Sequence, residues 1–314
     1  MKKIDFIEEI KLDSVDELFD YISPWGKLAK LDEFVFRGES SDTFKLLPKA
    51  LRENEKENFL NITKSKEDEY HSLIYESYQR LLEEKLLKRF YHLADKRGLE
   101  VPIAQKIRNY PSEEMKEFLL HCQGENSEWI PSELYEVASL AQHYGIHTRL
   151  LDWTYDIYVA MFFAFKGAID KEQTNLVIWA LNKEKLSRLE GSEVEVNVKF
   201  ITPHYSRNPN LNAQQGLFTH WPISSNKIFQ LHQHKEDRIK NNQLVDRTPL
   251  DDLIFNYLSK FEDRFLENIF KKFTLPSSEA KKGMEILARM GYDYSKIFPG
   301  YQGVADTIAN EYKY

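Results

Sequence analysis

The feature that most constrains the fold is a change of hydrophobic period along the chain. From about residue 66 to residue 94, apolar residues recur at helical spacing and charges fill the opposite face, which predicts a long amphipathic helix. After about residue 175 the period becomes two, and the apolar run Leu176–Leu181 is typical of a buried strand. Alternation over residues 194–200, Phe218, and the run 228–231 predict further strands.

Additional elements come from local signals. Ser14 and Glu17 have capping-box spacing, which predicts a short helix after them. Residues 33–37 alternate as a strand that we expect Gly38 to end. Further helices are predicted over about 131–144, 155–165 and 250–273, with a last one from Ser277 to Gly291, and the charged stretch 52–68 is predicted to be a loop. Because the strands are not regularly interleaved with helices, we expect an α+β fold with a small mixed or antiparallel sheet (strands near 33–37 and 175–231) surrounded by long amphipathic helices.

Length and composition set outer limits. A chain of 314 residues is expected to form a single domain over 1–314, with a helical lead-in over 1–30 and a C-terminal helical part over 250–314 packed on it. The net charge of −7 lacks the basic surplus of a duplex-binding protein. Cys122 is the one cysteine, so no disulfide can form within the chain, and we expect a reducing compartment. The apolar run 158–165 is too short to span a bilayer, so the sequence predicts a cytoplasmic protein with no membrane partner.

The first segment that can carry chemistry is Phe36-Arg37-Gly38-Glu39. The planar guanidinium of Arg37 suits phosphate binding, and Gly38 allows a ligand or another backbone to approach closely. Glu39 lies within reach of both. The alternative interpretation is an arginine at a strand end that pairs with a core carboxylate.

The second segment, 142–154, places many polar groups at a predicted helix end, a turn and the next helix start. Its candidate ligand-binding residues are Gln142, His143, Thr148, Arg149, Asp152 and Trp153. Such a polar set is costly to bury unless it is hydrogen-bonded, and Asp152 or Thr154 could cap the following helix. In the alternative interpretation Arg149 and Asp152 pair to brace the turn, and Trp153 belongs to the core.

The third segment, 210–220, holds Gln214, Gly216 and Phe218, which could contact a ligand at a strand end or form an ordinary turn. His232 and His234 with their acidic neighbours could bind a metal, but this stretch has the polar composition of a solvated surface, so we expect no metal. Nothing in the sequence marks Cys122 as a nucleophile.

Together these segments resemble the FRG-domain family. The resemblance rests on Phe36-Arg37-Gly38, Ala141-Gln142-His143-Tyr144-Gly145, Thr148-Arg149-Leu150-Leu151-Asp152-Trp153-Thr154, Phe162-Phe163-Ala164, Ala213-Gln214-Gln215-Gly216-Leu217-Phe218 and Ile297-Phe298-Pro299. It extends over about residues 30–300. His147 departs from the usual proline and Asn210 from the expected arginine. Family members are mostly bacterial or phage-borne, so the resemblance implies a fold more than an activity.

An aromatic-Arg-Gly motif at the end of an early strand is also similar to the opening motif of arginine-type ADP-ribosyltransferases. In those enzymes the arginine holds the phosphates of NAD, and a glutamate in a later Gln-x-Glu motif holds a ribose hydroxyl. Arg37 matches the arginine. The pair Gln214-Gln215 lies where the later motif is expected, but it lacks the glutamate.

The two resemblances imply an ADP-ribosyltransferase-like enzyme of a toxin or phage-defence system that consumes NAD. Arg37 would hold the diphosphate, and Asp152 or Gln214 would stabilise positive charge on the ribose. Ligand contacts would come from Gly38, Glu39, Gln142, His143, Thr148 and Arg149, with Trp153 or Phe218 stacked on the nicotinamide. The acceptor, a protein or a nucleic acid, stays open. The alternatives are a non-catalytic nucleotide- or nucleic-acid-binding module, a nuclease, and a motif that merely braces the fold.

Overall fold

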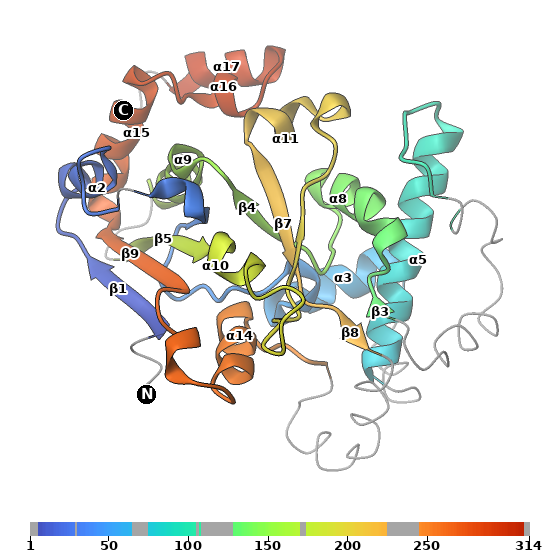
Figure 1. Cartoon of the computed structure of the whole chain (residues 1–314). Coiled ribbons are helices and arrows are strands. Elements are labelled where there is room, and N and C mark those ends of the chain that lie inside the picture. Colours follow the sequence, from blue (N-terminus) through green and yellow to red (C-terminus); the bar gives the residue numbers. More distant parts are fainter. Residues whose placement is uncertain are drawn as a thin grey trace.

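A seven-stranded mixed sheet forms the centre of the structure, which is a computed structural model (Figure 1). It describes residues 6–28, 30–64, 75–104, 107, 128–169, 174–224 and 245–310. The strands are β1 (Ile7–Lys11), β2 (Phe34–Glu39), β3 (Glu128–Trp129), β4 (Leu151–Thr154), β5 (Asn175–Asn182), β6 (Lys199–Ile201), β7 (Gly216–His220), β8 (Ile223–Ser224) and β9 (Phe270–Pro276). The helices are α2 (Val15–Ile22), α3 (Lys56–Thr63), α5 (Tyr75–Lys96), α8 (Tyr135–His143), α9 (Ile157–Ala168), α10 (Lys183–Ser187), α11 (Pro209–Ala213), α14 (Leu250–Leu258), α15 (Ala280–Arg289), α16 (Tyr294–Ile297) and α17 (Tyr301–Asn310).

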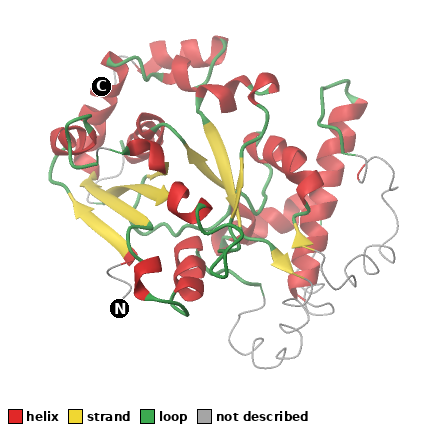
Figure 2. Ribbon diagram, viewed as in Figure 1, coloured by secondary structure: helices red, strands yellow, loops and turns green. Residues whose placement is uncertain are grey.

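The strand order of the sheet is β1-β9-β5-β2-β4-β7-β6, with β1 and β9 parallel and the other neighbours antiparallel. Helices lie around the sheet, as Figure 2 shows, so the predicted α+β class is confirmed although the sheet is larger than expected. β3 and β8 form a separate two-stranded ladder. Within the described residues, no helix combines the length and the apolar character that a membrane span requires.

Two buried clusters cover the two faces of the sheet. On one face α2, α9 and α15 pack on β2, β5 and β9 around Phe36, Phe165 and Phe273. On the other face α14 packs around Val35 and Phe270. Residues that alternate along β2 therefore point to different cores, as the period of a strand requires. Burial of these apolar faces is the main stabilising term of the fold.

The ladder between β2 and β4 is very short. β2 pairs with β5 over six residues, Phe34 to Glu39, but it pairs with β4 only where Phe36 faces Thr154. In Figure 1 β7 runs nearly upright whereas β1 and β9 are slanted, so the strand direction changes strongly across the sheet. We call the place where β2 and β4 part after this single pair the β2/β4 split.

Several predicted elements are confirmed. Ser14 caps α2 by accepting a hydrogen bond from the Glu17 amide, β5 covers the predicted apolar run, and β7 contains Phe218. The helices predicted over 131–144 and 155–165 correspond to α8 and α9, and the last predicted helix to α15. The predicted run 228–231 and residues 65–74 of the long helix lie outside the described residues.

Other predictions are wrong in instructive ways. The helix predicted over 250–273 ends at Leu258, and Phe270–Pro276 form β9 because this segment fills the place between β1 and β5. The lead-in begins with a strand, β1, and so the two ends of the chain are not purely helical. Part of the predicted loop 52–68 is the helix α3, and the strand predicted over 194–200 is reduced to β6.

Gly38 does not end its strand, which continues to Glu39. A Cβ atom at Gly38 would lie 1.8 Å from the carbonyl oxygen of Ala160 and 2.8 Å from the amide nitrogen of Ala164. The glycine therefore allows α9 to approach β2 closely. The close approach that the sequence predicts is made by a helix backbone.

We expect Gly38→Ala to prevent stable folding or to lower the free energy of unfolding by more than about 3 kcal/mol, since backbone atoms cannot give way to a methyl group. Gly191→Ala is the control: its φ is +74° but no atom lies within 4 Å of the added Cβ, so the cost should be about 1 kcal/mol. Urea unfolding followed by circular dichroism measures both. Equal losses would contradict the contact with α9.

His220 gives a prediction about acid stability. Its ring is buried, Nε2 accepts a hydrogen bond of 2.8 Å from the amide of Ile130, and burial followed by the charge of Arg149 lowers the pKa of His220 to about 3. The unfolded chain therefore binds the additional proton between about pH 6.5 and 3, and stability falls as the pH drops through that window.

We expect the free energy of unfolding of His220→Gln to depend less on pH than that of the natural protein, by up to about 1.4 kcal/mol per pH unit between pH 6 and 4. The glutamine amide keeps an acceptor for Ile130 but has no proton to gain. Chemical unfolding at each pH tests the difference. Parallel pH profiles for the two proteins would show that His220 is not held neutral by the fold.

Candidate functional site

The first two sequence segments meet at the β2/β4 split. The guanidinium of Arg37 donates from Nε to Glu39 Oε1 at 2.7 Å and from Nη1 to the carbonyl oxygen of Asp152 at 2.8 Å. Nη2 lies 2.7 Å from the same Glu39 oxygen, and Nη1 lies 3.6 Å from Asp152 Oδ2. Arg37 thus fills the space that opens where β2 and β4 part, and it bonds to a strand carbonyl there.

Polar side chains from the end of α8 extend this network. Gln142 Nε2 donates to Asp152 Oδ2 at 3.0 Å, and Gln142 Oε1 accepts from the hydroxyl of Thr148 at 2.8 Å. The same hydroxyl accepts from the amide of Leu150. We call Arg37, Glu39, Gln142, Thr148 and Asp152 the Arg37 cluster. Its members come from β2, α8, β4 and the loop between the last two, so the convergence of the two segments is a property of the fold.

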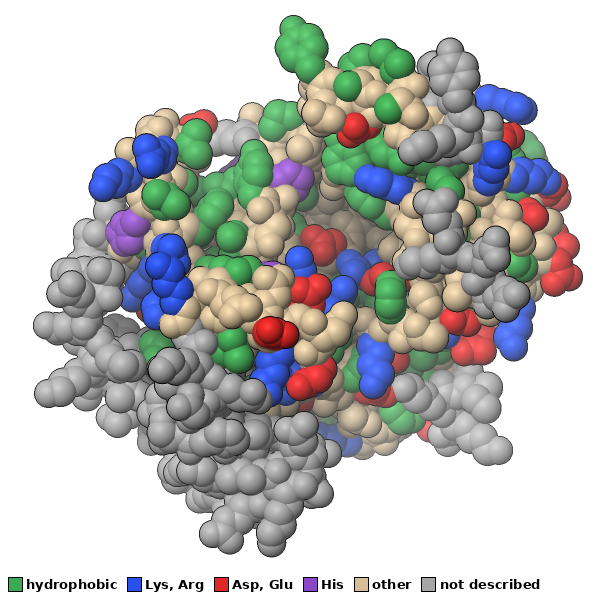
Figure 3. Space-filling view, turned by 180° about the vertical axis from the view of Figure 1, so that it is seen from behind, with side chains coloured by type: hydrophobic (Ala, Val, Ile, Leu, Met, Phe, Trp, Pro, Cys, Tyr) green, Lys and Arg blue, Asp and Glu red, His purple; other side chains and the backbone are tan. Residues whose placement is uncertain are grey.

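Exposure separates the members of the Arg37 cluster. The side chains of Arg37 and Glu39 are 12% and 10% exposed, whereas that of Asp152 is 55% exposed. Asp152 is therefore a carboxylate that is oriented by Arg37 and Gln142 and still open to a ligand. On the back of the molecule, acidic and basic side chains lie side by side around a central hollow (Figure 3). Burial alone would lower the pKa of Arg37, but the charges of Glu39 and Asp152 raise it, so the guanidinium stays charged.

His143 stands next to the Arg37 cluster. Burial lowers its pKa and the charge of Asp152 acts in the opposite direction. The imidazole is therefore predominantly neutral at pH 7 and can accept a proton.

Arg149 does not belong to the Arg37 cluster. Its Nε lies 2.8 and 2.7 Å from the two carboxylate oxygens of Glu83 on α5, and both side chains are about 3% exposed. Glu83 also accepts from Gln79 and from the indole of Trp129. Burial raises the pKa of Glu83, while Arg149 and these hydrogen bonds favour its charged form. The pairing of Arg149 with Asp152 that the sequence suggested is wrong, because Asp152 and Arg149 have different partners.

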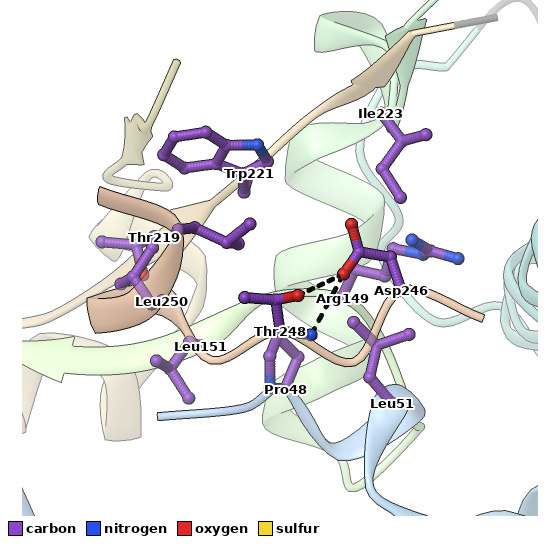
Figure 4. A pocket seen from close by; sticks show the side chains of 11 residues that line it. Pro48, Leu51, Arg149, Leu151, Thr219, Trp221, Ile223, Asp246, Thr248 and Leu250 are labelled. Atoms are coloured by element: carbon purple, nitrogen blue, oxygen red, sulfur yellow. Dashed lines mark hydrogen bonds between the residues drawn. The ribbon is translucent and has the colours of Figure 1, made fainter. Parts of the chain in front are cut away.

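A small cavity of about 40 Å³ lies beside this buried pair. Figure 4 shows Arg149, Trp221 and Asp246 around it, with Asp246 accepting hydrogen bonds from the amide and hydroxyl of Thr248. This volume can hold a few water molecules but no nucleotide. This cavity is therefore too small for the ligand that the sequence analysis predicts.

The two aromatic side chains predicted to stack on a ligand belong to the core. Trp153 is 3% exposed and its indole donates to the hydroxyl of Thr219 at 2.9 Å, and Phe218 is 1% exposed. The prediction that Trp153 or Phe218 stacks on nicotinamide is therefore wrong for this conformation, because both rings are buried. Sequence reasoning left the core interpretation of Trp153 open, and the structure selects it.

Gln214 also lies apart from the Arg37 cluster. The side-chain amide of Gln214 donates to the backbone carbonyl of Ile297 at 3.2 Å. The backbone carbonyl of Gln214 accepts from the hydroxyl of Thr154 at 2.7 Å. These bonds tie the end of α11 to α16 and β4. Neither Asp152 nor Thr154 caps α9, because Asp156 does so by accepting from the amide of Tyr158 at 2.9 Å.

Sequence reasoning missed Arg52, a half-buried arginine whose pKa is lowered by burial and by the charge of Arg37. It lies in the stretch that was predicted to be a loop, so no pattern distinguished it. In the described part of the chain, no group of three or more His, Cys, Asp or Glu side chains is arranged to hold a metal ion. His232, His234 and Cys122 lie outside that part.

The buried pair predicts a large stability effect. Glu83→Gln removes the buried carboxylate charge that lies 2.7 Å from Nε of Arg149, so we expect a loss of about 3–5 kcal/mol in the free energy of unfolding. Glu184→Gln is the matched control, because Glu184 and its partner Arg188 are both exposed. This pair should contribute less than about 1 kcal/mol to the free energy of unfolding. Thermal and urea unfolding of both variants test this difference. A loss under 1 kcal/mol for Glu83→Gln would mean that the charge of Glu83 contributes little to stability.

Comparison with known families identifies part of the chain. Residues 32–173 match the model of the FRG domain, and this range runs from just before β2 to just after α9. It contains both segments of the Arg37 cluster and leaves out the segment of Gln214. Searches of curated proteins and of solved structures gave no significant match. We conclude that this chain carries a domain of the FRG family.

Proposed function

We propose that the Arg37 cluster is an NAD-consuming site of the ADP-ribosyltransferase class, with Asp152 as its reactive carboxylate. The observation that supports this is a half-exposed carboxylate whose backbone and side chain are both held: Arg37 Nη1 binds the Asp152 carbonyl and Gln142 binds its Oδ2. A carboxylate fixed before the ligand arrives can stabilise charge that develops during a reaction.

The proposed reaction begins with cleavage of the nicotinamide–ribose bond of NAD. The bond between ribose C1′ and the nicotinamide nitrogen breaks, its electron pair leaves with the now neutral nicotinamide, and positive charge builds up on the ribose. Asp152 would stabilise that charge. Water or another acceptor then forms a bond to C1′ and loses a proton, and we assign the imidazole of His143, whose pKa burial lowers, as the group that takes up this proton.

The position of Arg37 modifies the role first assigned to it. All three nitrogens of its guanidinium contact Glu39 or Asp152, so this arginine mainly holds the strand that carries Asp152. We therefore assign Arg37 as a positioning residue and Asp152 as the residue that contacts the substrate.

A second candidate is a nucleotide-binding module without catalysis. It is favoured by the segment of Gln214 and Gln215, which lacks the expected glutamate, and by the side chain of Gln214, which is engaged with the carbonyl of Ile297. Such a module would bind a nucleotide at the same cluster and release no nicotinamide. The acceptor, a protein or a nucleic acid, and a role in a toxin or phage-defence system belong to the first candidate only.

Nicotinamide release from NAD by the purified chain tests the proposal. We expect Asp152→Asn to reduce the rate by about 100-fold or more, since the amide keeps the hydrogen bond to Gln142 but removes the charge. The melting temperature should change little, because the side chain is half exposed. Asp16→Asn, at an exposed carboxylate on α2, is the control and should react like the natural protein.

The results separate the two candidates. If Asp152→Asn and the natural protein release nicotinamide at equal rates, Asp152 has no role in the reaction. Binding of NAD without any release would favour the non-catalytic module.

A further inference from the structure

Arg52 lies beside the Arg37 cluster with unused hydrogen-bond donors. It follows the short helical turn Lys49–Leu51, and its Nε donates to the carbonyl of Leu47 at 3.0 Å. In the part of the chain that the structure describes, this is its one hydrogen bond, and no carboxylate lies within ion-pair distance. The two Nη groups therefore lack a protein acceptor there.

The surroundings of Arg52 are strongly charged. The charges of Arg37, Glu39, Asp152 and Glu55 all reach it, and its pKa is lowered by burial first and by Arg37 second. Glu39 is engaged with Arg37, and Glu55 Oε2 is engaged with His147 and Asn58 at 3.1 and 3.2 Å. A half-buried guanidinium next to a second one is stabilised by an anion, so the free side of Arg52 suits an anionic ligand.

The backbone around Arg52 is held in place. The amide of Ala50 donates to the carbonyl of Thr148 at 3.3 Å, and the carbonyl of Ala50 accepts from Gln79 at 3.0 Å. Thr148 is itself a member of the Arg37 cluster. The turn that carries Arg52 is thus fixed to the same loop that leads to Asp152, which is what a preorganised binding residue requires.

We propose that Arg52 binds the phosphates of the ligand that occupies the Arg37 cluster. The identity of that ligand as NAD rests on the proposed function, but the phosphate contact does not depend on catalysis. In this arrangement Arg52 holds the diphosphate, Arg37 orients β4, and Asp152 faces the ribose. The FRG motif itself contributes the positioning arginine, and the binding arginine comes from 15 residues further along the chain.

Two pairs of ligands isolate the phosphate contact. Binding of ADP and of adenosine is titrated by calorimetry, and nicotinamide release is followed from NAD and from nicotinamide riboside, which has no phosphate. For Arg52→Gln we expect ADP to bind about 10- to 100-fold more weakly, with adenosine binding and cleavage of the riboside unchanged. Arg52→Lys should retain part of the ADP affinity, because it keeps the charge but loses the planar fork.

Arg188→Gln is the matched control, since it removes an exposed arginine that pairs with Glu184 on α10. It should leave every ligand unaffected, and melting temperatures of all variants establish that they are folded. An Arg52→Gln protein that binds ADP as tightly as the natural one would overturn the proposal, as would equal losses for phosphorylated and phosphate-free ligands.

Failure of catalysis is recognised separately. If the natural protein binds ADP through Arg52 but releases no nicotinamide, the phosphate contact stands and the NAD-consuming function falls. If the natural protein cleaves NAD while Arg52→Gln does so at the same rate and the same KM, the function stands and the role of Arg52 falls. If the natural protein binds neither ADP nor NAD, both are wrong.

Discussion

The rest of the structure depends on the close approach of α9 to β2 at Gly38. The absence of a side chain there lets backbone meet backbone, and small residues of α9, Ala160 and Ala164, complete the contact. Because successive residues of a strand point to opposite faces, a glycine seated against α9 directs the arginine before it and the glutamate after it to the other side. One packing constraint thus orients Arg37 and Glu39 together.

The sequence predicts best those elements whose stability comes from their own residues. The cap of α2, the buried run of β5 and the apolar helix α9 each carry a local signal and were identified. β9 and β4 do not: Phe270 and Phe273 fit a helical period, and β4 has only four residues. Both segments are strands because they form backbone hydrogen bonds with strands that are distant in the sequence, and no local pattern contains that information.

The same limit applies to the candidate site. The motif resemblance named Arg37, Gln142, Thr148 and Asp152, and in the structure hydrogen bonds join these residues across up to 115 positions of the sequence. It grouped Arg149 with them because of its place in the sequence, although its side chain turns to the other side and pairs with Glu83. Arg52 had no motif at all. Which way a side chain points, and what lies opposite, follow from the packed fold alone.

The β2/β4 split has a mechanical consequence. Strands β1, β9, β5 and β2 form one half of the sheet and β4, β7 and β6 the other, and a single residue pair joins their ladders. The Arg37 side chain bridges the two strands there, because it donates to the carboxylate of Glu39 on β2 and to the carbonyl of Asp152 on β4. Arg37 therefore joins the two halves by side-chain hydrogen bonds at the place where their backbone ladders part. The relative position of the two halves depends on one side chain there.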